Sequence, residues 1–220
     1  MSKRLVIAID GPSGSGKSSV ARAVARALDL DYLDTGAMYR AVTWFIQNKG
    51  VPVTDHQAVV ENLSGLTITP STNPDIEKIL VGETDVTTII REQEVTSGVS
   101  FISAVPQVRT LLVELQRQVV EASTQGAVVE GRDIGSVVLP DADLKIFLTA
   151  DALARAQRRA AQVTEDVEET KTQLLNRDHA DSTRTVSPFA QNDGAIVVDT
   201  THMELTEVVE HILKLVAEQA

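Results

Sequence analysis

A glycine-rich loop near the start of the chain constrains the fold more than any other feature. The loop reads Gly11-Pro12-Ser13-Gly14-Ser15-Gly16-Lys17-Ser18 and matches the pattern G-x-x-x-x-G-K-[ST]. The apolar run 5–9 precedes it, and the alanine-rich stretch 19–28 follows it. A strand, a glycine loop and a helix in this order form a P-loop, whose backbone N–H groups surround phosphate oxygens. The sequence therefore predicts a phosphate site at the start of an α/β fold. In that chemistry Lys17 reaches the β- and γ-phosphates, and the Ser18 hydroxyl is a ligand of Mg²⁺.

The composition limits the class of protein. The chain has 220 residues, of which 43% are hydrophobic, enough for one core. It has no cysteine, so it needs no oxidising compartment. The apolar run after the basic start ends at Asp10, too short for a signal peptide, and no stretch approaches the roughly 20 apolar residues of a membrane span. A net charge of −11 argues against nonspecific binding of nucleic acid. We expect a cytoplasmic monomer with neither a membrane nor a nucleic-acid partner.

Alternating patterns predict the fold class. Apolar runs predict five strands, at 5–9, around 32–33, and at 127–129, 144–148 and 195–198. Helical patterns lie at about 17–28, 36–48, 106–124, 151–161 and 204–217. This alternation predicts a three-layer α/β/α fold around a five-stranded parallel sheet.

Two segments depart from the alternation. Segment 62–92 has three apolar runs, at 66–70, 79–81 and 86–90, with turn residues between them, and predicts a small antiparallel meander. Segment 162–185 is polar, is flanked by arginines and has little core signal, which predicts a mobile helical flap.

Two further motifs follow predicted strands. Thr35 is the expected N-cap of the second helix, and with Arg40 one turn later this helix start could hold a second anion. Arg132 and Asp133 follow the third strand. Ligands of open α/β sheets bind at the carboxyl ends of strands, so we expect the loop, Arg40 and Arg132 to meet in one crevice. A local surface ion pair is the alternative for Arg132 and Asp133.

Taken together, the motifs resemble bacterial cytidylate kinases from end to end. The matching segments are 11–18, 33–40, 90–95, 130–135, 145–148 and 177–184. The resemblance implies in-line transfer of a phosphoryl group from ATP to CMP or dCMP, with Mg²⁺, in pyrimidine nucleotide metabolism. It also implies three regions: a P-loop core (1–35, 96–150 and 186–220), a nucleoside-monophosphate lobe (36–95) and a lid (151–185).

The resemblance also assigns site residues. The ATP loop matches Gly11, Pro12, Ser13, Gly14, Ser15, Gly16, Lys17, Ser18 and Ser19. The substrate-phosphate contacts match Thr35, Arg40, Arg132 and Arg184, the cytosine contacts match Ser100, Arg109 and Asp133, and the ribose contacts match Arg177 and Asp181. The catalytic set is Lys17, Arg132 and the lid arginines Arg155, Arg158 and Arg159.

Elementary chemistry agrees with the cytosine assignment. Cytosine carries an amino donor beside ring acceptors, which suit a carboxylate and a guanidinium respectively. Two alternatives stay open at this point: a kinase for UMP or another small anion, and a GTPase-like switch. A switch would need [NT]-K-x-D, whereas the nearest match, Thr170-Lys171-Thr172-Gln173, lacks the aspartate.

Overall fold

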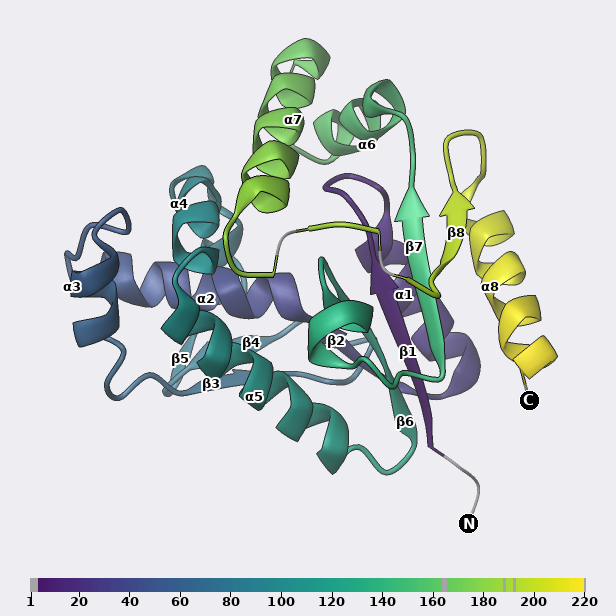
Figure 1. Cartoon of the computed structure of the whole chain (residues 1–220), viewed down its shortest axis with the longest axis horizontal. Coiled ribbons are helices and arrows are strands. Elements are labelled where there is room, and N and C mark those ends of the chain that lie inside the picture. Colours follow the sequence, from purple (N-terminus) through teal and green to yellow (C-terminus); the bar gives the residue numbers. More distant parts are fainter. Residues whose placement is uncertain (1–3, 164–165, 188, 192, 220) are drawn as a thin grey trace.

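A five-stranded parallel sheet forms the centre of the molecule, as predicted (Figure 1). The computed structural model describes residues 4–163, 166–187, 189–191 and 193–219. The strand order is β2-β6-β1-β7-β8. These strands are β1 (Leu5–Asp10), β2 (Asp31–Asp34), β6 (Gly126–Gly131), β7 (Leu144–Thr149) and β8 (Ile196–Asp199). All pairings among them are parallel, so their carboxyl ends meet at one edge of the sheet.

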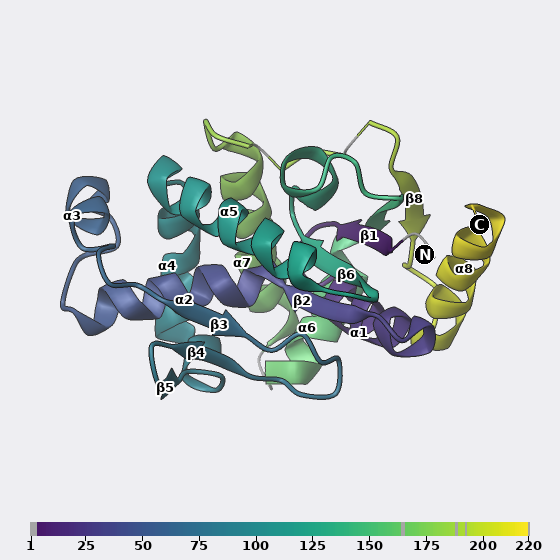
Figure 2. The same ribbon diagram turned by 90° about the horizontal axis from the view of Figure 1, so that it is seen from below.

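Two hydrophobic clusters cover the two faces of the sheet. Side chains alternate along β1, so that Ile7 and Ile9 face one cluster while Ala8 faces the other. The first cluster includes α1 (Lys17–Leu28) and α8 (Leu205–Gln219). The second includes α2 (Thr35–Asn48), α4 (Gln93–Ser103) and α5 (Pro106–Ala122). Figure 2, seen from below, places α5 and α1 on opposite sides of the sheet. No helix among the described residues is long and apolar enough to cross a membrane.

The predicted meander forms a three-stranded antiparallel sheet, but its third strand comes earlier in the chain than predicted. The strands are β3 (Ile68–Pro70), β4 (Ile79–Val81) and β5 (Thr84–Asp85), and α3 (His56–Glu61) precedes them. The prediction of a third strand at 86–90 is wrong. Gly82, with φ +58°, reverses the chain directly after β4, and the Asp85 carboxylate then accepts bonds from the N–H and hydroxyl of Thr87. The chain therefore turns into the short helix η1 (Ile89–Arg91).

Contacts with α1 fix this insert beside the sheet. Nε of Arg26 lies 2.6 Å from Oδ1 of Asp75, and Nη2 of Arg22 lies 3.2 Å from Oε1 of Glu77. The backbone N–H of Tyr32, on edge strand β2, donates to the carbonyl of Thr72 at 2.8 Å. The insert therefore covers part of the edge of the main sheet.

Helix α4 was not predicted, and Gly98 lets it pack closely on α2. A Cβ atom at Gly98 would lie 2.8 Å from Cγ2 of Thr43 on α2. Val95, Val99 and Ile102 form the buried side of α4. The close packing fixes the position of α4, which carries the predicted site residue Ser100.

Replacing Gly98 with alanine should destabilise the protein by about 1 kcal/mol. Overpacking costs about 1–3 kcal/mol, and the better helix propensity of alanine offsets about 1 kcal/mol of it. Urea unfolding measures the change, and Ser97→Ala, at an exposed position of the same helix, is the control. A Gly98→Ala variant as stable as the wild type would mean that α2 and α4 have room to separate.

A helical hairpin stands above the carboxyl ends of the strands (Figure 1). It consists of α6 (Ala152–Val163) and α7 (Val167–Thr183), and we call it the α6–α7 hairpin. The predicted flap is therefore helical, although its residues 164–165 lie outside the described residues. The Asp166 carboxylate caps α7 by accepting bonds from the N–H groups of Glu168 and Glu169.

Candidate active site

The glycine loop leads from β1 into α1, as predicted. Gly14 and Gly16 have φ values of +76° and +88°, which glycine adopts without a steric penalty. Nζ of Lys17, the first residue of α1, donates to the carbonyl of Pro12 at 2.7 Å. Burial of this ammonium, with the nearby charge of Arg132, lowers the pKa of Lys17. A phosphate bound beside this ammonium would favour its charged form.

Glu130, near the end of β6, bonds to Ser18 beside the loop. The Ser18 hydroxyl donates to Oε2 of Glu130 at 3.0 Å, and the Tyr32 hydroxyl donates to Oε1 at 2.5 Å. Burial raises the pKa of Glu130. The described part of the chain contains no cluster of three or more metal-binding side chains. Kinases hold Mg²⁺ through one or two protein oxygens plus the nucleotide phosphates, so Ser18 and Glu130 fit this ion.

Asp10, the last residue of β1, fixes the segment after β6. Its carboxylate accepts bonds from the backbone N–H groups of Ile134 and Gly135, at 2.8 and 2.9 Å. These two residues begin η2 (Ile134–Val138), one turn of π-helix that follows Arg132 and Asp133. Burial raises the pKa of Asp10 to about 6, although the two N–H bonds oppose the shift. Asp10 therefore helps to position both predicted site residues.

Arg132 lies between the loop and the α6–α7 hairpin. Its Nη1 donates to the carbonyl of Gly11 at 3.0 Å and lies 3.1 Å from Oδ1 of Asp178. Its Nη2 lies 2.9 Å from Oδ2 of Asp181, and its guanidinium lies 4.9 Å from the centre of the Phe189 ring. The alternative of a local ion pair with Asp133 is not what the structure shows, because the two side chains have different partners.

Thr35 and Arg40 lie in the first turns of α2, where the predicted cap is wrong. The N-cap of α2 is Asp34, whose carboxylate accepts a bond from the N–H of Ala37 at 2.8 Å and also pairs with Arg40 at 3.1 Å. Thr35 begins the helix, and its hydroxyl donates instead to the carbonyl of Glu130 at 2.7 Å. Aspartate caps helices as well as threonine does, so the adjacent Asp34 takes this role.

Two of the predicted base contacts, Arg109 and Asp133, form a buried pair, and Arg184, predicted to contact the substrate phosphate, lies beside them. Arg109 pairs with Oδ2 of Asp133, and Nη2 of Arg184 lies 3.7 Å from the same oxygen. The Arg109 guanidinium lies 5.7 Å from the centre of the Tyr39 ring. The side chains of Arg109 and Asp133 are only 4% and 7% exposed. Ser100 is half-buried on α4.

The lid arginines do not all face the loop in the same way. Nη1 of Arg155 donates to the carbonyl of Ser13 at 2.9 Å and pairs with Asp178. Arg158 bonds to the carbonyl and hydroxyl of Thr200, after β8, at 2.5 and 2.9 Å. Arg159 is half-buried on α6. Arg155 thus contacts the loop directly, whereas Arg158 contacts the segment after β8.

Several buried polar atoms of the predicted site have no hydrogen-bond partner within the described ranges. They belong to the loop, to α2, α5 and α6, and to the end of the hairpin: Oγ of Ser15, Nε of Arg40, Nε and Nη1 of Arg109, Nε of Arg155, Nε of Arg177 and Nη2 of Arg184. Burial also lowers the pKa of Arg177 to about 10. Buried donors are normally satisfied, so this concentration of guanidinium groups indicates a site for a ligand with several anionic oxygens.

Comparison with known proteins identifies the family of the chain. The family model described as cytidylate kinase matches residues 7–218. The chain belongs to the cytidylate kinase family. The cytidylate kinase of Streptomyces avermitilis is 51% identical over 216 residues, which cover 98% of this chain and 94% of the relative. That of Rhodococcus jostii is 48% identical over 221 residues, covering 98% and 96%. Membership of this family makes the chain a phosphotransferase.

Solved structures support the fold of this family member. A gluconokinase from Sinorhizobium meliloti aligns with a TM-score of 0.53 at 16% identity, covering 99% of this chain and 95% of that one. A shikimate kinase from Acinetobacter baumannii, solved in complex with shikimate, aligns with a TM-score of 0.52 at 15% identity, covering 98% and 94%. At these identities the likeness concerns the fold alone.

Four acidic residues of this site, Asp10, Asp34, Glu130 and Asp178, were not among the predicted site residues. Asp10 and Asp34 each end a strand and Glu130 is the next-to-last residue of β6, so a charged residue at the end of an apolar run was the available signal. Asp178 follows Arg177 directly and had no comparable signal, because its partners lie 23 to 165 positions away in the chain. Cytidylate kinase motifs thus indicate the segment but not the contacts of each side chain.

Proposed function

We propose that this protein transfers the γ-phosphoryl group of ATP to the phosphate of CMP and of dCMP. The observation that carries the proposal is the set of buried guanidinium donors that have no hydrogen-bond partner among the described residues, on Arg40, Arg109, Arg155, Arg177 and Arg184. A donor phosphate beside Arg155 and an acceptor nucleotide beside the other four arginines would satisfy these donors. Membership of the cytidylate kinase family supports the choice of substrates.

The buried pair of Arg109 and Asp133 suits cytosine. Both described contacts of the Asp133 carboxylate are to Oδ2, which leaves Oδ1 to accept a bond from the cytosine amino group. Nε and Nη1 of Arg109 remain to donate to the ring acceptors. Uracil offers a carbonyl where cytosine offers the amino group, and a carboxylate cannot bond to it. The site therefore favours CMP over UMP.

The transfer itself needs positioning more than acid–base chemistry. The acceptor is a phosphate oxygen that is already anionic, so no general base has to remove a proton. We infer that Lys17 and Arg155 bind the donor phosphates, and that Arg40, Thr35 and Arg132 bind the acceptor phosphate in line with them. Mg²⁺ at Ser18 and Glu130 would add positive charge on the transferring group. The α6–α7 hairpin would exclude water, which otherwise competes as an acceptor.

We extend the proposal to the organisation of the chain. Residues 151–185 are the lid, residues 36–95 are the nucleoside-monophosphate lobe, and the rest is the P-loop core. The proposal includes a monomeric protein that binds neither nucleic acid nor a membrane. A chain without cysteine suits the cytoplasm, where ATP and CMP are available.

A substrate panel tests the proposal. ADP formation is measured with ATP alone and with ATP plus CMP, dCMP, UMP or AMP. We expect rapid ADP formation with CMP and dCMP, slower formation with UMP, and little with ATP alone. Equal rates with and without any nucleoside monophosphate would instead favour an ATPase or a switch.

Replacing Arg40 with methionine should raise KM for CMP about 10- to 100-fold and change KM for ATP less than twofold. The guanidinium lies at the start of α2 with Nε unsatisfied, and a bond between charged groups contributes roughly 1.5–3 kcal/mol. Initial rates at varied CMP and at varied ATP separate the two constants. A variant that loses ATP affinity and keeps CMP affinity would place Arg40 on the donor side.

A further inference from the structure

One carboxylate of the α6–α7 hairpin lies among the groups assigned above to phosphate. Oδ1 of Asp178 accepts a bond from the backbone N–H of Ser13 at 3.1 Å and lies 3.1 Å from Nη1 of Arg132. Oδ2 pairs with Nη1 of Arg155. The Asp178 side chain is 15% exposed, so water competes little for these contacts. Donors from three separate segments of the chain thus converge on one side chain.

These three donors are the kind that binds phosphate. The Ser13 N–H belongs to the glycine loop, whose N–H groups face phosphate oxygens in P-loop proteins. Arg132 and Arg155 offer guanidinium groups, which bind carboxylates and phosphates through the same geometry. The Ser13 N–H is a single donor, so it cannot serve Asp178 and a phosphate oxygen fully at the same time. One anion must displace the other.

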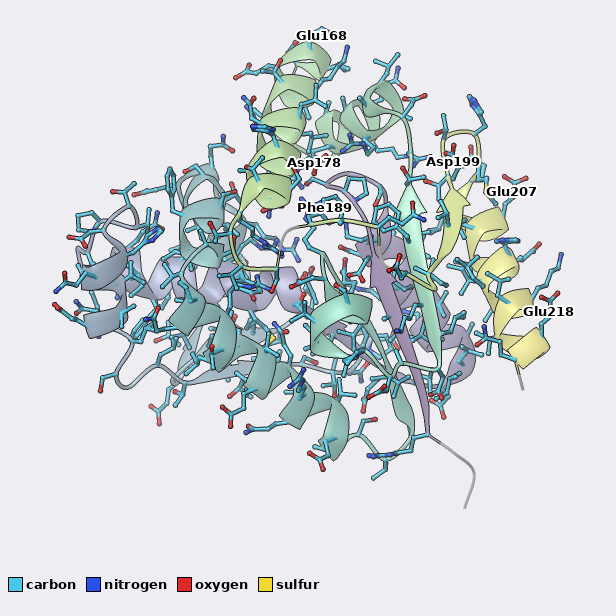
Figure 3. All side chains as sticks on the ribbon, viewed as in Figure 1. Glu168, Asp178, Phe189, Asp199, Glu207 and Glu218 are labelled. Carbon is cyan, nitrogen blue, oxygen red and sulfur yellow. The ribbon has the colours of Figure 1, made fainter. Side chains whose placement is uncertain are left out.

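The position of Asp178 along α7 explains how the carboxylate arrives there. Figure 3 shows Glu168 at the outer end of α7 and Asp178 in the half of the helix nearer to the sheet. One turn later, Asp181 reaches Nη2 of the same Arg132. The hairpin therefore presents two carboxylates to the phosphate side of the site, and Asp178 is the one that also contacts the loop.

We propose that Asp178 is an internal competitor for phosphate. In the ligand-free protein its carboxylate occupies the position of a phosphate oxygen between Ser13, Arg132 and Arg155, and nucleotide phosphate displaces it. The inference rests on the proposed function, which assigns these groups to phosphate. A single anion such as inorganic phosphate has no other contacts to offset the displacement. A nucleotide also gains base and ribose contacts, so Asp178 favours nucleotides over free anions.

The size of the effect follows from the population of the open site. If the carboxylate occupies the position about nine-tenths of the time, the apparent affinity for an anion falls about tenfold. Removing the carboxylate should therefore raise the apparent anion affinity by the same factor of about ten. A residue with a merely structural role in the hairpin would not raise anion affinity when it is replaced.

The test measures binding of inorganic phosphate to the ligand-free protein by calorimetry. Asp178→Asn should bind it about tenfold more tightly than the wild type. Asp178→Ala, which adds no amide donor, is the second variant, and Asp178→Glu restores a carboxylate and should return the affinity towards the wild-type value. Glu169→Gln removes the same charge from an exposed position of α7 and should change the affinity less than twofold.

The outcomes separate the two proposals. Unchanged or weaker phosphate binding by both folded variants, Asp178→Asn and Asp178→Ala, would overturn the competitor role and make Asp178 a positioning residue for Arg155. An equal gain in Glu169→Gln would also overturn it, because the effect would then come from net charge. The measurement uses no CMP, so a failure of the proposed function would show separately, in the substrate panel.

Discussion

Replacing Lys17 with methionine should lower kcat for CMP phosphorylation about 1,000-fold while leaving the melting temperature nearly unchanged. Loss of one positioned donor to a developing charge costs about 100- to 1,000-fold in rate, and phosphoryl transfer depends on such charges more than most reactions. The Lys17 ammonium donates to the Pro12 carbonyl, and burial lowers its pKa. Methionine keeps the length of the side chain and removes the cost of burying the charge, so the fold should not lose stability.

The control for this prediction is Lys171→Met. Lys171 lies on α7, and its Nζ pairs with Glu168 at 3.5 Å, near the outer end of the hairpin. A partly exposed pair of this kind contributes little, so kcat should change less than twofold. Single-turnover rates and thermal melting are measured for both variants. A Lys17→Met enzyme with near-normal kcat and an unchanged melting curve would contradict the P-loop mechanism.

Periodicity and motif position were enough to predict the central sheet. The five strands are short apolar runs and the flanking helices have apolar residues at helical spacing, and these patterns end close to the observed bounds. The strands of the antiparallel insert were harder to predict from the sequence. β5 is only two residues long and is ended by a side-chain turn at Asp85, so the longer apolar run that follows it was wrongly chosen as the strand. Helix α4 begins without a side-chain cap and contains a glycine, so two usual sequence signals of a helix are missing.

For the site, too, the sequence predicts the position of a residue in the fold but not its contacts with distant segments. Sequence position alone predicts that Arg40 and Arg132 lie near the loop, because strand ends share one edge of the sheet. Sequence position does not reveal that Arg132 forms ion pairs with Asp178 and Asp181, because those contacts depend on how the hairpin packs against the sheet. Nor does it reveal that Arg158 bonds to Thr200. Which anion each arginine meets is a property of packing between distant segments.

Replacing Asp133 with asparagine should narrow the preference for CMP over UMP by more than tenfold. A carboxylate only accepts hydrogen bonds, which suits the cytosine amino group, whereas an amide can turn either its oxygen or its N–H₂ group towards the base. CMP should lose a bond between a charged and a neutral group, worth roughly 1.5–3 kcal/mol, and UMP should lose an unfavourable contact. The measurement is kcat/KM for both substrates with both proteins.

Two controls keep the Asp133 result specific to the base. Asp133 also pairs with Arg109, and removing one partner of a buried pair is destabilising, so the melting curve and KM for ATP of the variant are measured alongside. Asp141→Asn removes a carboxylate from an exposed position beyond η2 and should leave the ratio unchanged. If Asp133→Asn lowers kcat/KM for CMP and UMP by the same factor, Asp133 acts only by holding Arg109 in place. Discrimination between the bases would then have to come from Arg109 or Ser100, because no carboxylate would be accepting from the cytosine amino group.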